Sequence, residues 1–492
     1  MTTTLPSPRN HRSPLRSSPL ARLWASLVLL TSALVAAGCG RPETPVVRDP
    51  GAVVAEGQLG TPVLLANGQS TVYARIRLST LPRPERPRGP VNVALAIDTS
   101  GSMEGAPIEE ARKAALRMID ALQDGDQLAV VAFHSKTEVL LPTTELSKEV
   151  RGDVKQRVSA MRAQGTTDMS AGLATAINEV RQHFSNKGVN RVVLLGDGIP
   201  NAPGNIVDIA QQAAREGIAV TTLGLGLDYD ETLMGQIAQA SGGRFRYIEG
   251  AEKVADIFAE EMAQIDRVYA RNASMTIKAG PGVRIDAVVG GRDSSPGSTA
   301  YVPLGDIARG DTRDVLVRMT VTPRKAGVPI ELIDAEITFD DALEGGGRLE
   351  RRVYLGAHTT TLEAEVAKAK NPEVELSAAL AEASATTLQA LALAKNGQYQ
   401  RARAMLTSGS QAARAQADRT PSAELRKHAE DMTAVASDMP AVDTPAATPA
   451  PESYDFEDES AGSAPAPEVN ITPAAAKRLK TVHAKAMDAL GH

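Results

Sequence analysis

The sequence is poor in cysteine and in aromatic residues. A single Cys among 492 residues excludes a disulfide framework and any metal cage of several thiolates within the chain. Aromatic side chains make up only 3% of the residues, which disfavours stacking platforms for sugars or single-stranded nucleic acid. The 59 acidic residues outnumber the 53 basic ones, and an acidic chain is a poor candidate for binding nucleic acid. We therefore expect no nucleic-acid partner.

Residues 1–38 have the layout of an export signal peptide. They contain four arginines and no acidic residue, and residues 23–37 form an uncharged apolar run that ends in small side chains. The run is too short to span a bilayer comfortably, so a cleaved signal is favoured over a transmembrane helix. No other stretch is expected to span a membrane.

The sole cysteine follows this run directly. The run ends in Val35-Ala36-Ala37-Gly38-Cys39, which resembles a bacterial lipobox with Ala36 in place of the usual Leu. The resemblance implies that Cys39 is acylated and becomes the N-terminus of a cell-envelope lipoprotein, at the outer membrane or cell surface or on the periplasmic face. Membrane contact would then be through the lipid anchor only. The alternative is a small buried cysteine beside an ordinary cleavage site.

Hydrophobic periodicity divides the first part of the mature chain into three segments. Residues 39–60 contain few apolar side chains and predict a tether. Residues 61–85 include a strand-like alternation at 71–78. Residues 86–268 alternate strands with amphipathic helices, a pattern that predicts an α/β unit with a mainly parallel, doubly wound sheet covered on both faces.

The second part of the chain changes period twice. Residues 269–358 alternate with period two between Gly-rich turns and predict an antiparallel β-sandwich. The strand at 71–78 is expected to join it, which leaves the α/β unit inserted in or flanked by the sandwich. An α-helical region is expected at 362–438, an acidic, Pro-rich disordered linker at 439–473, and a last short helix with a basic face at 474–492.

Oxygen-bearing side chains follow two buried strands of the α/β unit and precede one of its helices. The strand at 91–97 ends in Asp98-Thr99-Ser100-Gly101-Ser102-Met103, and the strand at 191–195 ends in Gly196-Asp197-Gly198. Ligands bind outside the carboxyl ends of strands in open α/β sheets. Thr166 and Thr167 lie in a Gly-rich loop before a helix. Hydroxyl and carboxylate oxygens suit a hard cation such as Mg²⁺, Mn²⁺ or Ca²⁺.

The order and placement of these residues resemble the metal-ion-dependent adhesion site (MIDAS) of von Willebrand factor type A (VWA) domains. The resemblance implies that Ser100, Ser102 and Thr167 are direct metal ligands, with Thr166 as the rival of Thr167. It implies that Asp98 and Asp197 act mainly through bound waters. The usual Thr before the second Asp is replaced by Gly196.

The resemblance implies a binding function without catalysis. If neutral hydroxyls dominate the ligand set, a protein partner that presents an Asp or Glu can complete the coordination of the cation. An envelope structural or assembly factor, whose helical tail recruits partners and whose metal site is structural, is the alternative function. The same residue types could also merely cap helices and form turns.

Enzymatic readings fit the sequence less well. A phosphatase that uses an aspartyl nucleophile needs a second acid where Ser100 stands. A Ser-His-Asp hydrolase needs a nucleophile elbow, and the sequence presents none. We therefore expect a protein that is not an enzyme.

Overall fold

The computed structural model describes residues 51–82, 89–196, 205–225, 230–248, 267–291, 297–323, 325–343, 347–440 and 473–491, with a few single residues between them. Cys39, Asp197 and residues 441–472 lie outside the described residues, and so do most of residues 249–266.

A six-stranded sheet forms the centre of the α/β unit. Its strand order is β6-β5-β4-β7-β8-β9. Every neighbouring pair is parallel except β5 and β6, which are antiparallel. The strands are β4 (Val91–Asp98), β5 (Gln127–Phe133), β6 (Thr137–Glu145), β7 (Val189–Gly196), β8 (Ala219–Leu225) and β9 (Phe245–Ile248).

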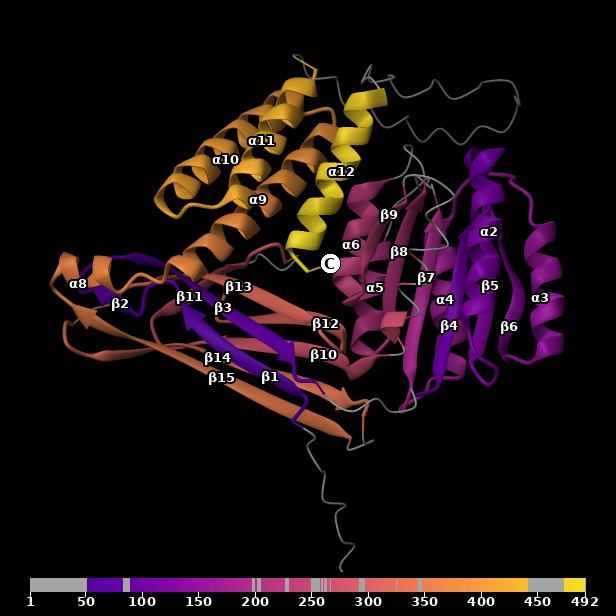
Figure 1. Cartoon of the computed structure of the whole chain (residues 1–492), viewed down its shortest axis with the longest axis horizontal. Helices are drawn as coiled ribbons and strands as arrows, with labels where there is room; N and C mark the ends of the chain where they lie inside the picture. Colours follow the sequence, from indigo (N-terminus) through magenta and orange to yellow (C-terminus); the bar gives the residue numbers. More distant parts are fainter. Residues whose placement is uncertain are drawn as a thin grey trace, which may run out of the picture. The chain divides into compact units, whose positions relative to one another are not determined.

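Helices cover both faces of this sheet (Figure 1). All eight residues of β4 are buried. Val93 and Leu95 belong to the core that contains the apolar faces of α2 and α3, whereas Ala94 and Ala96 belong to the core with α4, α5 and α6. The doubly wound α/β fold predicted from the sequence is thereby confirmed. The helices are α2 (Ala106–Ala121), α3 (Lys148–Ala160), α4 (Met169–Gln182), α5 (Ile206–Arg215) and α6 (Glu231–Ser241).

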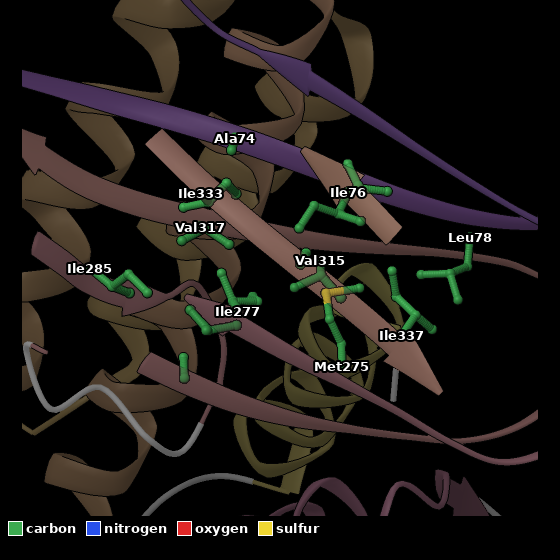
Figure 2. Packing of buried hydrophobic residues seen from close by; sticks show 14 of the residues in the cluster. Ala74, Ile76, Leu78, Met275, Ile277, Ile285, Val315, Val317, Ile333 and Ile337 are labelled. Atoms are coloured by element: carbon green, nitrogen blue, oxygen red, sulfur yellow. The ribbon is translucent and has the colours of Figure 1, made fainter. Parts of the chain in front are cut away.

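Two further sheets form the β-sandwich. One has the order β1-β3-β13-β11 and the other β12-β10-β14-β15-β2. Figure 2 shows apolar side chains of β3, such as Ile76, gathered with Met275 and Ile337 of the opposite sheet in one buried cluster. The strands are β1 (Val53–Leu59), β2 (Val63–Leu65), β3 (Ser70–Thr80), β10 (Val268–Ala279), β11 (Val283–Val288), β12 (Thr299–Ala308), β13 (Thr312–Val321), β14 (Pro329–Asp341) and β15 (Arg348–Thr360).

The α/β unit is inserted in the sandwich. Strand β3 precedes the unit in sequence and pairs antiparallel with β13, from Ser70 opposite Val321 to Ser79 opposite Thr312. Strand β10 follows the unit and lies in the opposite sheet. The alternation at 71–78 therefore belongs to the sandwich core, as the sequence indicated.

The prediction of a tether at 39–60 is wrong for its second half. Residues 53–59 form β1, which pairs with β3 along its whole length. Only its end residues Val53 and Leu59 are buried, while Glu56 and Gln58 are exposed. An edge strand gains its backbone hydrogen bonds from the neighbouring strand, so it needs little apolar sequence and gives a weak periodic signal.

Helices follow the sandwich as the sequence predicts. The short α8 (Glu363–Lys368) precedes α9 (Pro372–Lys395), α10 (Tyr399–Arg419) and α11 (Ala423–Asp438), and α12 (Pro473–Ala489) packs against α9. Among the described helices, α9 matches a membrane span by length and apolar composition alone, and 39% of its apolar window is buried inside the protein.

The α/β unit and the sandwich meet through buried charges and close backbone contact. A Cβ on Gly305 of β12 would lie 1.9 Å from the carbonyl oxygen of Gly242 at the end of α6, so only glycine fits there. Beside this contact lies an arginine cluster, which we define as Arg191, Arg244, Asp306, Asp311 and Arg313. Its ion pairs Arg191–Asp306 and Arg244–Asp311 each measure 2.8 Å. Burial, with the nearby Arg244 charge, lowers the pKa of Arg313 to about 10.

Candidate metal centre

The loop that follows β4 folds back on the end of its own strand. The backbone N–H of Ser100 donates to Oδ1 of Asp98 at 2.8 Å, and both residues are buried. A 3-10 turn then runs over Gly101–Met103, with the Met103 side chain buried in the core. The turn places the hydroxyl oxygen of Ser102 3.0 Å from that of Ser100. Two hydroxyls and a buried carboxyl group therefore gather at the carboxyl end of β4.

The Gly-rich loop before α4 is bonded directly to this first loop. The N–H of Gln164 donates to the carbonyl of Thr99 at 2.8 Å, and the N–H of Gly101 donates to the carbonyl of Gly165 at 2.9 Å. Gly165 adopts φ +68°, a conformation that favours glycine. Two backbone hydrogen bonds therefore hold the loop that carries the threonines beside Ser100 and Ser102.

The two candidate threonines in this loop differ in burial. Thr167 is 6% exposed, whereas Thr166 is exposed. The next residue, Asp168, caps α4 by accepting a hydrogen bond from the N–H of Ala171 at 3.0 Å. The role of Asp168 is therefore to cap the first turn of α4.

Strand β7, which leads to the predicted site residue Asp197, ends beside Asp98. Strand β7 pairs with β4, with Leu195 opposite Ile97, and ends at Gly196. A Cβ on Gly196 would lie 2.8 Å from Cβ of Asp98 and 3.1 Å from its Oδ2. A threonine at this position would therefore require the Asp98 side chain or the strand to shift, which gives a steric reason for glycine here. Asp197, the next residue, lies outside the described residues.

A polar pair that sequence reasoning did not assign to this region lies next to these loops. His134, at the end of β5, is half-buried, and its Nε2 lies 3.1 Å from Nε2 of Gln164. The carbonyl of His134 also accepts a hydrogen bond from the N–H of Asp168 at 2.9 Å. No local pattern marks these residues in the sequence, because their proximity depends on the packing of β5 against the threonine loop.

The donor set fits a hard cation. Within the part of the chain that the structure describes, no cluster of three or more His, Cys, Asp and Glu residues could hold a metal. The site here has a different composition: two neighbouring serine hydroxyls, a threonine in a loop bonded to theirs, and the buried carboxyl group of Asp98. Oxygen donors of this kind are suited to Mg²⁺ or Mn²⁺ and poorly suited to soft metals.

Residues 92–260 match the family model of the von Willebrand factor type A domain. The chain contains a type A domain. The chain is 25% identical over 270 residues to an uncharacterized protein of Synechocystis sp., covering 52% of this chain and 63% of that protein. It is also 25% identical over 250 residues to the uncharacterized protein YfbK of Escherichia coli, covering 48% of this chain and 43% of that protein. The chain thus spans less than two thirds of either relative.

The structural similarity to one solved protein extends beyond the type A domain. The von Willebrand factor type A protein from Catenulispora acidiphila superposes with a TM-score of 0.60 at 20% identity, covering 78% of this chain and 89% of that one. At this identity the likeness shows the fold alone.

Proposed function

We propose that this chain binds a protein partner through a divalent cation held by Asp98, Ser100, Ser102, Thr167 and Asp197, as a lipid-anchored protein of the bacterial cell envelope. The observation that carries the proposal is the 3.0 Å separation of the Ser100 and Ser102 hydroxyl oxygens beside the buried Asp98. Type A domains commonly mediate protein–protein contacts and often hold a divalent metal, which supports the same assignment.

The proposed site residues contribute two kinds of oxygen ligand. Ser100, Ser102 and Thr167 would supply neutral hydroxyl oxygens, and Asp98 and Asp197 would supply negative charge through bound waters. A cation bound there would attract a further anionic ligand, because hydroxyls neutralise little of its charge. The proposed partner presents an Asp or Glu carboxylate to it. Nothing in this assignment calls for a nucleophile or a general base, so we propose binding and no catalysis.

Ser100→Ala is expected to weaken Mg²⁺ or Mn²⁺ binding by at least about a hundredfold. Outer-shell residues of metal sites typically contribute about ten- to a hundredfold in affinity, and a direct ligand should contribute no less. Calorimetric titration of the full chain measures the loss, with Ser135→Ala as the matched control, because Ser135 is exposed in the neighbouring loop and bonds to His134. Equal affinity in Ser100→Ala and the unaltered chain would contradict the site.

An envelope assembly factor remains the second candidate, because the helices after the sandwich form a packed bundle with its own core. Partner capture from envelope extract separates the two functions. Capture that is lost with a chelator and in Ser100→Ala supports the metal-bridged function. Capture that survives both, and is lost when the helical region is altered, supports the assembly factor.

Cys39→Ser is expected to move the protein from membrane to soluble fractions. The lipobox resemblance implies a lipid on this cysteine, and a serine has no sulfur atom through which a thioether-linked lipid could be attached. Fractionation of cells that express each form measures the change. An unaltered distribution between the fractions would show that the anchor assignment is wrong.

A further inference from the structure

The last helix, α12, is seated on two separate parts of the molecule. Its His483 ring meets Phe245 of the type A domain edge-on, with ring centroids 5.3 Å apart. Asp488 pairs with Arg246 at 3.0 Å. On the other side, α12 packs along α9, and Lys485 pairs with Asp431 of α11 at 2.8 Å. The α12 seat, as we name these surfaces of α6, β9, α9 and α11, therefore joins the type A domain to the helical bundle.

The contact between α12 and its seat includes buried polar groups. Lys480 is 6% exposed and pairs with Glu231 of α6. His483 is 2% exposed, and its Nδ1 has no hydrogen-bond partner among the described residues. A buried ring nitrogen without a partner loses its hydrogen bond to water on docking, which weakens the attachment.

An open groove borders α12 and its seat, and α12 contributes only His483 and Met487 to its lining. It has a volume of about 500 Å³. Gln236 of α6, Gln389 of α9, and His483 and Met487 of α12 line it, among other residues. Because this groove is open, one margin of the α12 seat stays accessible while α12 is docked, although Val482 and Ala486 of α12 are buried.

The covalent connection does not force α12 into this position. Residues 439–472 separate it from α11, which is 34 residues in the sequence. Yet Arg478 of α12 pairs with Asp438 at the end of α11 at 3.0 Å. Helices that lie this close are usually joined by about 2–8 residues, so α12 can leave its seat without pulling on α11.

We propose that α12 is a reversibly docked ligand, and that the α12 seat is a helix-binding site able to accept residues 473–491 from solution as well as from its own chain. Met487 supplies the central apolar contact, since its thioether lies against Gly235 of α6, where a Cβ would come within 3.2 Å of the Met487 methyl. This inference is independent of the metal centre.

Peptide exchange tests the proposal on the full chain. A protease site is introduced within residues 453–459, and a fluorescent peptide of residues 473–492 is added before and after cleavage. We expect the cleaved protein to exchange its own segment for the labelled peptide. The uncleaved protein should bind the peptide at least about a hundredfold more weakly, because the tethered copy competes at a high effective concentration. A cleaved protein that retains its segment without exchange over a day, or equal binding by both forms, would overturn the proposal.

Variants of the peptide keep the test independent of protein folding. Met487→Asp in the peptide should reduce affinity at least about a hundredfold, because it places a charge against α6. His483→Leu should bind more tightly, because it removes the buried nitrogen that lacks a partner. Lys485→Ala is the matched control and should change affinity by less than about threefold, because its ion pair with Asp431 is partly exposed, at 46% and 26%. Equal binding of the Met487→Asp peptide would show that the peptide does not occupy this seat.

Discussion

Asp306→Ala is expected to lower the free energy of unfolding by roughly 3–5 kcal/mol, the usual cost of removing one partner from a buried ion pair. The Asp306 carboxylate is 7% exposed and accepts from Arg191 at 2.8 Å. Its other oxygen accepts from the backbone N–H of Asn272 at 3.2 Å. Removing it leaves three arginines of the arginine cluster with Asp311 as the remaining acid, in a region that excludes water.

The effect should be specific to this buried cluster. Urea unfolding followed by circular dichroism measures it, with Asp418→Ala as the control. Asp418 also pairs with an arginine, Arg426, at 3.2 Å, but the two side chains are 72% and 54% exposed. Exposed pairs contribute about 0–1 kcal/mol. If both variants unfold at the same urea concentration as the unaltered chain, the cluster does not hold the type A domain on the sandwich.

Acidification is expected to destabilise the docking of α12. Burial lowers the pKa of His483 from its ordinary value of 6.5 to about 4. A group whose folded-state pKa is lowered stabilises the folded state fully above its unfolded pKa. That stability is lost as the pH falls from 6.5 through 4, and a shift of this size corresponds to roughly 3 kcal/mol. The charged groups that face the ring are Glu231 and Asp230 of the α6 end, Lys480 of α12 and Lys395 of α9.

The measurement compares the urea midpoint at pH 7.5 and pH 4.5. His483→Leu should lose less stability between these two values than the unaltered chain, because it has no ring to protonate. His428 in the bundle is a useful second position, since burial also lowers its pKa, and His428→Leu should leave the His483 contribution in place. An acid sensitivity that is identical with and without His483 would refute this origin of the effect.

The sequence predicted the elements whose apolar pattern is continuous. Strand β4 is buried on both faces, so its unbroken apolar run identifies it without any tertiary information. Strand β1 is different, because its stability comes from the hydrogen bonds of β3 rather than from its own side chains. The basic face predicted for the last helix is partly wrong for the same kind of reason. Lys480 and His483 are buried, because Glu231 and Phe245, far away in sequence, lie against them.

The sequence predicted the location of the candidate site on the sheet but not its detailed geometry. Residues after the carboxyl end of a buried strand must lie at one edge, so Asp98 and Ser100 could be assigned from the sequence. Thr167 is preferred to Thr166 only through the family resemblance, because the position of either side chain depends on how the loop is bonded to Thr99 and Gly101. The close approach of Gly196 to Asp98 likewise follows from the pairing of β7 with β4.

The pairing of β1 with β3 also decides how the molecule would respond to mechanical load. Val53 at the start of β1 lies opposite Thr80 at the end of β3, so the chain toward the N-terminus and the chain toward the type A domain leave the hairpin at the same end. Tension between these two points would open the antiparallel ladder one pair at a time, rather than shearing all its hydrogen bonds together. Strand β1 is also at the edge of its sheet, and Arg351 of the opposite sheet holds the carbonyl of Val53 at 2.8 Å. A pull on the type A domain against the N-terminal segment would therefore detach β1 first and leave the remaining strands of the sandwich in register. The first resistance would come from the N–H of Leu81, which donates to the carbonyl of Ala52 at 2.8 Å, and the next from Arg351.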